Sequence, residues 1–297
     1  MKLLFCESEI NRNNVDEAFL DEYVSALDNG FSTLFYNFEE KSTQKIIRNE
    51  KAENLVYRGW MLKPELYEKL YYELLEKNYK LINNPKEYKN CHYLPENLQF
   101  INNLTPKTIF QRIENEKSID ILIEKANIFD GKPVIIKDYV KSEKHYWNTA
   151  CFVNDSLDKK CLKDSILNLL DIRGESFNEG IVIREYIELN QLTKHSKSGM
   201  PISEEYRLFF LNNELFSIYN YWEEGNYQDN NLNIDKFKEI AKTIKSNFFT
   251  MDIAREKNGN LIIMELGDGQ VSAIPKNEDK NYFYKKLKNI LEMQTSA

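Results

Sequence analysis

The sequence is poor in the residue types that define several common classes of protein. Its 297 residues include four cysteines and three histidines, and no two cysteines form a CxxC pair. This argues against a disulfide framework or a cysteine-rich zinc site, and favours a reducing, cytoplasmic setting. No apolar run approaches the roughly 18–20 residues of a membrane-spanning helix, and the apolar start of the chain is too short for a secretory signal.

An excess of basic residues is also absent. The chain has 40 Lys and Arg residues against 47 Asp and Glu residues, a formal net charge of −7. A protein dedicated to duplex DNA needs a basic face that neutralises phosphates, so a nucleic acid is not the expected partner. The first apolar run, Lys2–Cys6, is not followed by GxGxxG, which argues against a dinucleotide site.

The length and hydrophobic content do support folded domains. With 297 residues, 42% of them hydrophobic, the chain is long enough for two domains. Strand and helix signals alternate in the first third, which predicts a small parallel α/β sheet of Rossmann type over residues 1–104. The expected strands are 2–6, 31–38, 55–57 and 79–82, and the expected helices are 15–27 and 64–77.

From residue 105 the pattern indicates an α+β fold, which we divide into 105–179 and 180–297. Thr105 followed by Pro106 predicts a helix start with Lys107 in its first turn. An Asn-Gly turn predicts a hairpin of strands 248–255 and 261–265, and the polar segment 190–203 predicts a long loop. Further strands are expected at 134–140, 146–153, 180–189 and 206–221, and helices at 157–170, 234–244 and 282–293.

Two acidic residues of this hairpin are candidate metal ligands. Asp252 and Glu265 lie thirteen positions apart and equally far from the Asn-Gly turn, so their carboxylates can meet across the strands. Magnesium sites use one or two carboxylates together with nucleotide phosphates. Asp268 follows in a glycine-rich turn and is a third candidate. The alternative is that these acids are solvated at strand ends.

Basic residues follow the apolar run 134–136. Lys137 ends this run and needs an anionic partner if it is buried. Lys141, Lys144 and His145 make the next loop cationic enough to hold a triphosphate. Alternatively, Lys137 lies at a sheet edge and reaches water, and the loop is simply solvated.

Two further strands carry candidate binding residues. The run 180–188 passes through Arg184 into Glu185-Tyr186-Ile187-Glu188, where backbone groups can contact an adenine edge and Glu188 a ribose. Arg207 opens the apolar strand that follows Glu204 and Glu205, and its guanidinium suits planar oxyanion recognition. The alternatives are an ordinary strand with charged exit residues and an ion pair of Arg207 with Glu204 or Glu205.

The order of these elements resembles the ATP-grasp superfamily. A lysine at a strand end precedes Glu-Tyr-Ile, an acid-x-Arg strand, and an Asp and a Glu thirteen residues apart. Three further motifs resemble the R-two-K clade, small ATP-grasp proteins of phages and bacterial conflict loci. They are Val56-Tyr57-Arg58-Gly59, Lys141-Ser142-x-Lys144-His145-x-Trp147 and Glu265-Leu266-Gly267-Asp268-Gly269-Gln270-Val271.

The resemblance implies a fold and a set of roles. It implies an ATP-grasp fold after a pre-ATP-grasp-like sheet, with ATP and Mg²⁺ as cofactors. Catalytic cations would be Lys137 and Arg207, and magnesium ligands Asp252, Glu265 and Asp268. ATP would contact Lys107, Lys137, Lys141, Lys144, Arg184, Glu185, Tyr186, Ile187 and Glu188.

The chain departs from the ATP-grasp pattern at two places. The segment 138–147 contains no glycine, whereas many members carry a glycine-rich loop over the phosphates, so side chains must make these contacts. The usual E-x-N metal motif is Glu265-Leu266-Gly267 here, which leaves Asp268 as the substitute ligand.

The resemblance implies an ATP-dependent carboxylate–amine ligase that works through an acylphosphate. Its partners would be an amine and a small-molecule, peptide or protein carboxylate, with Arg58 and His145 as candidate substrate-binding residues. For Arg58 a structural role is an equal alternative. A phosphotransferase and a non-catalytic nucleotide-binding module of a viral or defence system stay open as functions, and a homodimer as an assembly.

Overall fold

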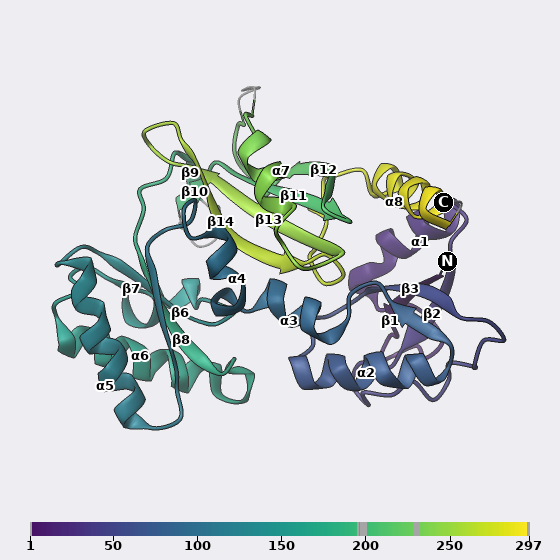
Figure 1. The fold of residues 1–297 in the computed structure, drawn as a ribbon, viewed down its shortest axis with the longest axis horizontal. Coiled ribbons are helices and arrows are strands. Elements are labelled where there is room, and N and C mark those ends of the chain that lie inside the picture. Colours follow the sequence, from purple (N-terminus) through teal and green to yellow (C-terminus); the bar gives the residue numbers. More distant parts are fainter. Residues whose placement is uncertain (1, 195, 197–200, 228–231, 296–297) are drawn as a thin grey trace.

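A parallel sheet forms the first part of the computed structural model, which describes residues 2–194, 196, 201–227 and 232–295 (Figure 1). Its strands run in the order β2-β1-β3-β4, and every neighbouring pair is parallel. Leu3 to Cys6 of β1 are all buried, and because successive side chains point to opposite faces, both faces of this strand are covered. The strands are β1 (Lys2–Cys6), β2 (Ser32–Tyr36), β3 (Glu53–Arg58) and β4 (Tyr79–Leu81).

Helices cover both faces of this sheet. Helix α2 (Pro64–Glu76) begins with proline at its first position and buries Tyr67, Leu70, Tyr71 and Leu74, an i, i+3, i+4, i+7 stripe. Helix α1 (Leu20–Asp28) lies on the other face, after the 3₁₀ turn Glu17–Phe19. The predicted parallel α/β sheet is therefore confirmed.

Two short helices, which the sequence analysis did not predict, connect this sheet to the rest of the chain. Helix α3 (Pro85–His92) begins at Asn84, whose side chain accepts from the Glu87 backbone while Glu87 bonds back to Asn84. Helix α4 (Leu94–Ile101) follows after one residue. Figure 1 shows both helices between the parallel sheet and the two later sheets.

The second sheet is antiparallel, in the order β5-β8-β6-β7. Helices α5 (Glu116–Lys125) and α6 (Lys159–Arg173) bury Leu122 and Ile166 against it in one apolar core. Short 3₁₀ turns lie at Ala126–Phe129 and Gly174–Ser176. The strands are β5 (Thr108–Arg112), β6 (Val134–Asp138), β7 (Phe152–Val153) and β8 (Gly180–Glu185).

Two predictions for this region are wrong. Thr105 does not cap a helix: its hydroxyl donates to the Ile263 carbonyl, and residues 108–112 pair with β8 as a strand. Residues 146–153 do not form a long strand either, because Lys144–Tyr146 is a 3₁₀ turn and Trp147–Cys151 is π-helical. Of the predicted strand, only the last two residues, which form β7, pair with β6.

The third sheet is also antiparallel, in the order β12-β11-β13-β14, and helix α7 (Asp235–Ala241) packs on it. Its central strand β13 is buried from Phe248 to Ala254. The predicted hairpin is confirmed, with Gly259 of its turn at φ +90°, where glycine is favoured. The strands are β11 (Glu205–Leu211), β12 (Glu214–Asn220), β13 (Phe248–Arg255) and β14 (Leu261–Asp268).

The segment predicted as a loop at 190–203 contains two paired strands, β9 (Gln191–Lys194) and β10 (Pro201–Ser203). Residues 195 and 197–200 of that prediction lie outside the described residues. Helix α8 (Lys280–Thr295) ends the described chain and lies beside α1, which brings the two ends of the chain together (Figure 1).

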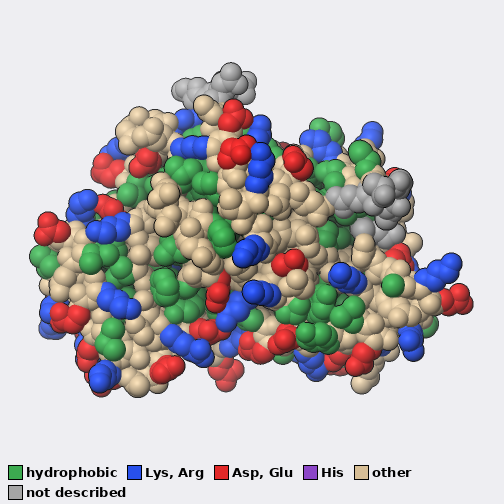
Figure 2. All heavy atoms as spheres, in the orientation of Figure 1, with side chains coloured by type: hydrophobic (Ala, Val, Ile, Leu, Met, Phe, Trp, Pro, Cys, Tyr) green, Lys and Arg blue, Asp and Glu red, His purple; other side chains and the backbone are tan. Residues whose placement is uncertain are grey.

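The order of the sheets confirms the predicted fold class, a parallel α/β sheet followed by antiparallel sheets with helices. None of the helices in the described part has the length and apolar character needed to cross a bilayer. On the face drawn in Figure 2, basic and acidic side chains are interspersed.

Candidate functional site

A cavity of about 280 Å³ lies where the three sheets approach one another. Five residues predicted from the sequence line it: Lys137, Lys141, Arg207, Asp252 and Glu265. They come from the end of β6, the loop that follows it, and three neighbouring strands of the third sheet. The fold thus brings together cations and carboxylates that are up to 128 positions apart in the sequence.

Arg207, Asp252 and Glu265 form one row across the third sheet. The register pairs Arg207 of β11 with Asp252 of β13, and Asp252 with Glu265 of β14. The prediction that Asp252 and Glu265 lie side by side across the hairpin is therefore confirmed. A register shift between Asp252 and Ile253 lies on the turn side of this pair, where Ile253 pairs with Ile263. The shift therefore brings Glu265, rather than Met264, opposite Asp252.

The two acids have different surroundings. Arg207 binds both Asp252 oxygens, at 2.9 Å from Nε and 2.8 Å from Nη2, and Asp252 is 4% exposed. Burial raises the pKa of Asp252, and Arg207 opposes this rise. The Glu265 side chain is 43% exposed, and Lys137, Lys141 and Lys144 lower its pKa to about 2 against the effect of burial. Glu265 is therefore the more accessible anion.

Lys137 and Arg184 lie on the same face of the second sheet, close to Glu265. The Lys137 ammonium lies 3.4 Å from Glu265 Oε2, so the buried lysine has the anionic partner that it was expected to need. Burial lowers the pKa of Lys137. Arg184 donates to the Met264 carbonyl and the Thr105 hydroxyl, and burial lowers its pKa to about 10. Arg184 therefore links β8 to β14 beside the site.

The loop after β6 is ordered by Asp138 rather than by glycine. Its Oδ1 accepts from the backbone N–H groups of Val140 and Lys141, and its Oδ2 binds Arg173 Nε at 3.0 Å. Lys141 reaches the cavity, whereas the Lys144 ammonium lies 5.8 Å from the Trp222 ring centre.

Lys107 and the residues expected to contact adenine and ribose lie around the end of β8. The Glu185 N–H donates to the Lys107 carbonyl, which places the two side by side. Tyr186 packs edge-on against Phe152, with ring centres 5.2 Å apart. Glu188 is exposed and pairs with Lys257. Among the described residues, those that line the cavity do not include Lys107, Lys144, His145, Arg184, Glu185, Tyr186, Ile187 or Glu188, and their ligand roles stay predictions.

Asp268 is not placed with the other two acids. It lies three residues beyond Glu265 on the same strand, so the two side chains point to opposite faces. Asp268 is fully buried and accepts from the Asn83 side chain, the Gln270 backbone and the Gln270 side chain. The described residues contain no group of three or more His, Cys, Asp and Glu that could hold a metal ion. The third ligand position predicted for Asp268 is thus not supported.

Arg58 is a structural residue rather than a substrate-binding one. Only 1% exposed, it binds Glu22 through two nitrogens at 2.9 Å each and also donates to the carbonyls of Gly269 and Ser272. Tyr284 of α8 donates to the same Glu22 carboxylate at 2.6 Å. The guanidinium therefore has no free edge for a substrate. His145 is exposed and outside the cavity, and its substrate role stays a prediction.

Several lining residues were missed by the sequence analysis. His92 of α3 and Asn97 of α4 form part of the wall, and the Tyr221 ring centre lies 4.7 Å from the Arg207 guanidinium carbon. No short motif marks them, because their place depends on how α3 and α4 pack against β14. The capping pattern of Asn84 and Glu87 could have predicted a helix in residues 85–101, and this was the available signal for His92 and Asn97.

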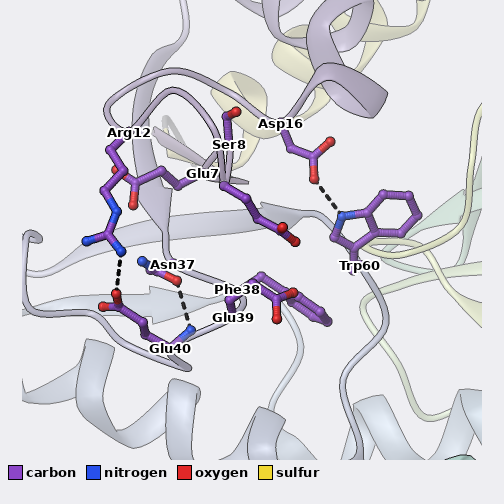
Figure 3. Close-up of a pocket in the computed structure, with 10 residues that line it drawn as sticks. Glu7, Ser8, Arg12, Asp16, Asn37, Phe38, Glu39, Glu40 and Trp60 are labelled. Atoms are coloured by element: carbon purple, nitrogen blue, oxygen red, sulfur yellow. Dashed lines mark hydrogen bonds and ion pairs between the residues drawn. The ribbon is translucent and has the colours of Figure 1, made fainter.

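A second cavity, of about 130 Å³, lies at the carboxyl ends of β1, β2 and β3 (Figure 3). Two contacts join side chains that line it: Arg12 binds Glu40 at 2.7 Å, and the Trp60 indole donates to Asp16 at 2.8 Å. It shares no lining residue with the first cavity and lacks the combination of lysines and paired carboxylates found there.

The architecture is that of the ATP-grasp fold. D-cycloserine synthetase DcsG superposes with a TM-score of 0.61 at 10% identity, covering 98% of this chain and 100% of that one. A RimK domain ATP-grasp protein from Sphaerobacter thermophilus gives 0.57 at 11% identity, over 96% and 98%. The macrocyclase MdnC from Microcystis aeruginosa gives 0.56 at 13% identity, over 97% and 100%.

The family model described as the ATP-grasp domain of R2K clade family 3 matches residues 129–287, more than half of the chain. The chain belongs to this family. A comparison with curated proteins finds no match.

Proposed function

We propose that the chain is an ATP-dependent carboxylate–amine ligase that requires Mg²⁺. The observation that carries the proposal is the convergence of Lys137, Arg207 and the Asp252–Glu265 pair in one cavity. Transfer of a phosphoryl group needs cations around its oxygens, and these residues supply them without a nucleophilic side chain. Membership of the R2K ATP-grasp family supports the same reading.

The proposed reaction has two steps. A substrate carboxylate oxygen attacks the γ-phosphorus of ATP, the bond to the β–γ bridging oxygen breaks, and ADP leaves. An amine nitrogen then attacks the acyl carbon of the acylphosphate, phosphate leaves, and the nitrogen loses a proton to solvent. Lys137 and Arg207 would face the transferred phosphoryl oxygens, where fixed cations stabilise the transition state.

The carboxylate pair fits a magnesium ion. One or two carboxylates with phosphate oxygens and water are the usual ligands of Mg²⁺ in nucleotide sites. Bound there, the ion would neutralise charge on the phosphates. Glu265 offers exposed oxygens, whereas Asp252 would have to exchange Arg207 for the metal. We infer that Arg207 holds Asp252 in the free protein and turns to the nucleotide when it binds.

The end of β8 would hold the nucleotide base. Glu185, Tyr186 and Ile187 would contact adenine, with Glu188 towards the ribose, while Lys107, Lys141, Lys144 and Arg184 would add positive charge along the phosphates. Several structural neighbours were solved with peptides, among them PsnB with precursor peptide PsnA2 and MdnC with MdnA. A peptide is accordingly one class of carboxylate that we propose for this chain.

Mass spectrometry of a cell-extract reaction with Mg²⁺ and ATP tests the proposal. The parent should form ADP and a product joined by an amide bond, whereas Lys137→Ala should lower the rate by roughly 10²-fold or more, because it removes a cation from the transferred phosphoryl group. Lys163→Ala, at a partly exposed lysine of α6 paired with Glu116, is the matched control. A stable phosphorylated product without amine dependence would indicate phosphotransfer, and nucleotide binding without ADP formation would indicate a binding module.

A further inference from the structure

The loop that follows β6 carries Lys141 and is tied to helix α6 at both of its ends. Arg173, the last residue of α6, makes both ties: its Nε binds Asp138 Oδ2 at 3.0 Å, and its Nη1 binds Glu143 Oε1 at 3.1 Å. The remaining nitrogen, Nη2, donates to the Ser176 carbonyl at 2.7 Å. Every nitrogen of this guanidinium therefore has a partner, and two of the three partners are carboxylates of the loop.

Asp138 in turn fixes the backbone of Lys141. Its Oδ1 accepts the N–H groups of Val140, at 2.7 Å, and of Lys141, and its own N–H donates to the Lys141 carbonyl at 2.9 Å. The carboxylate is fully buried and also accepts the backbone and side-chain N–H groups of Asn178, at 3.3 and 2.9 Å. The N–H and the carbonyl of Lys141 are thus both held by one buried residue, which Arg173 holds in its place.

The side chain of Lys141 is directed to the cavity by this fixed backbone. Lys141 lines the 280 Å³ cavity, and against the effect of burial its charge, with those of Lys137 and Lys144, lowers the pKa of Glu265 to about 2. Within the described part of the chain, the Lys141 ammonium forms no ion pair and no hydrogen bond of its own. The loop therefore presents an unpaired cation to the cavity from a backbone that is held in place.

We propose that Arg173 is a positioning residue for ATP binding, which clamps the loop at Asp138 and Glu143 and so holds Lys141 ready for the phosphates before the nucleotide binds. The inference rests on the proposed function, because it takes ATP as the ligand, and it deepens that function by assigning how a loop without glycine meets the phosphates. A loop that is already ordered in the free protein loses little conformational entropy on binding. Only arginine has the planar fork of nitrogens that can hold two carboxylates at once.

Amide hydrogen exchange of the free, full chain tests whether the loop is preformed. We expect the N–H groups of Val140 and Lys141 to exchange slowly in the parent, since both are bonded to a buried carboxylate. In Arg173→Lys a single ammonium replaces the three nitrogens, so these two groups should exchange roughly tenfold faster, while the amides of β13 keep the protection of the parent. Fast exchange in the parent, or unaltered exchange in Arg173→Lys, would overturn the proposal.

Calorimetric titration with ATP and Mg²⁺, without acid or amine, tests the consequence for binding. Glu143→Ala removes only the tie at the far end of the loop, and Glu116→Ala, which removes the glutamate paired with Lys163 of the same helix, is the matched control. We expect the Kd for ATP to rise roughly tenfold in Glu143→Ala and in Arg173→Lys, and to stay unchanged in Glu116→Ala. Loss of a negative charge near the phosphates would by itself strengthen ATP binding, so a weakening in Glu143→Ala reports the clamp rather than the charge.

Lys141→Met shows whether the clamp acts through Lys141. In that background Glu143→Ala should weaken ATP binding no further, because the ammonium that the clamp positions is gone. Additive losses, or ATP binding as tight as in the parent by the folded variants Glu143→Ala and Arg173→Lys, would overturn the clamp while the nucleotide site stands. ATP binding without ADP formation would overturn the ligase reaction alone. A parent chain that does not bind ATP would overturn the proposed function, and this inference with it.

Discussion

At the scale of single residues, Asp252 and Glu265 are neighbours with unequal access to a metal. Both oxygens of Asp252 are bound by Arg207, whereas Glu265 forms, within the described part of the chain, one ion pair, at 3.4 Å, with Lys137. A buried ion pair is destabilised strongly when one partner is removed, because the other charge then stays buried without compensation. Changes at the two acids should therefore have different consequences.

Glu265→Gln should raise the Mg²⁺ concentration needed for half-maximal activity by roughly tenfold or more, because it replaces a charged ligand by a neutral one. Asp252→Asn should instead lower the maximal rate and the stability more than Glu265→Gln does, since Arg207 loses its anion. A magnesium titration of ADP formation measures both, with Glu239→Gln on the exposed side of α7 as control. An unchanged magnesium dependence in both variants would place the metal elsewhere.

Asp268 should make the stability depend on pH. Burial raises its pKa from 3.8 to about 7, although Asn83 and Gln270 donate to it. Between these values the folded protein holds a proton that the unfolded chain releases. This contribution to the free energy of unfolding is present in full below pH 4 and is lost as the pH rises through 7, by at most about 1.4 kcal/mol per pH unit.

Asp268→Asn cannot ionise, so we expect it to remove that decline. Urea unfolding of the parent and the variant between about pH 5 and pH 8 measures the difference. Parallel pH dependences of the two proteins would show that Asp268 is ionised throughout this range.

At the scale of elements, local signals predicted those parts of the fold that depend on local geometry. The Asn-Gly turn sets where β13 reverses into β14, because Gly259 adopts the positive φ that the turn requires. The register shift between Asp252 and Ile253 then pairs Asp252 with Glu265 rather than with Met264. Helix α2 was likewise predictable from the spacing of its apolar residues alone.

The predictions that failed depend on contacts between distant segments. Residues after Thr105 form a strand because β8 supplies a partner 68 to 76 positions later, and no property of the Thr-Pro pair reveals that partner. His92 and Asn97 were missed for the same reason. Asp268 was expected in a turn, but pairing with Phe249 extends β14 and turns its side chain away from Glu265.

The buried pair of Arg58 and Glu22 joins several elements. Arg58 ends β3, Glu22 lies on α1, and Tyr284 of α8 bonds to the same carboxylate. We expect Arg58→Met or Glu22→Gln to destabilise the protein by about 3–5 kcal/mol, because each leaves the other side chain buried without its partner. Urea unfolding measures the loss.

The double variant Arg58→Met/Glu22→Met should be less destabilised than the sum of its single variants, since no charge stays unpaired. The KM for the acid substrate should stay unchanged in any Arg58 variant that remains folded. A raised KM with unaltered stability would instead return Arg58 to the substrate site.

At the scale of the whole molecule, the sheets are joined by side chains that cross between them. One apolar cluster combines Phe5 and Val56 of the parallel sheet with Phe209, Phe248 and Phe283 of the last sheet and α8. The cavity has walls from the second and third sheets, represented by Lys137 and Glu265, and from helix α3, which follows the parallel sheet and contributes His92. A ligand in this cavity therefore contacts parts that unfolding would separate.

Mg²⁺ and ATP together should for that reason stabilise the chain against heat. A ligand that binds only the folded state, at about 100 times its Kd, adds about 2.7 kcal/mol, or a rise in Tm of roughly 4 °C for a chain of 297 residues. Thermal unfolding with ATP and Mg²⁺, alone and together, measures the shift. Lys137→Ala should reduce it by loss of the phosphate contact, whereas Lys163→Ala, on the far helix α6, should keep it. A Tm that nucleotide leaves unmoved, with and without Mg²⁺, would contradict nucleotide binding at the junction of the three sheets and with it the roles proposed for Lys137, Arg207 and Glu265.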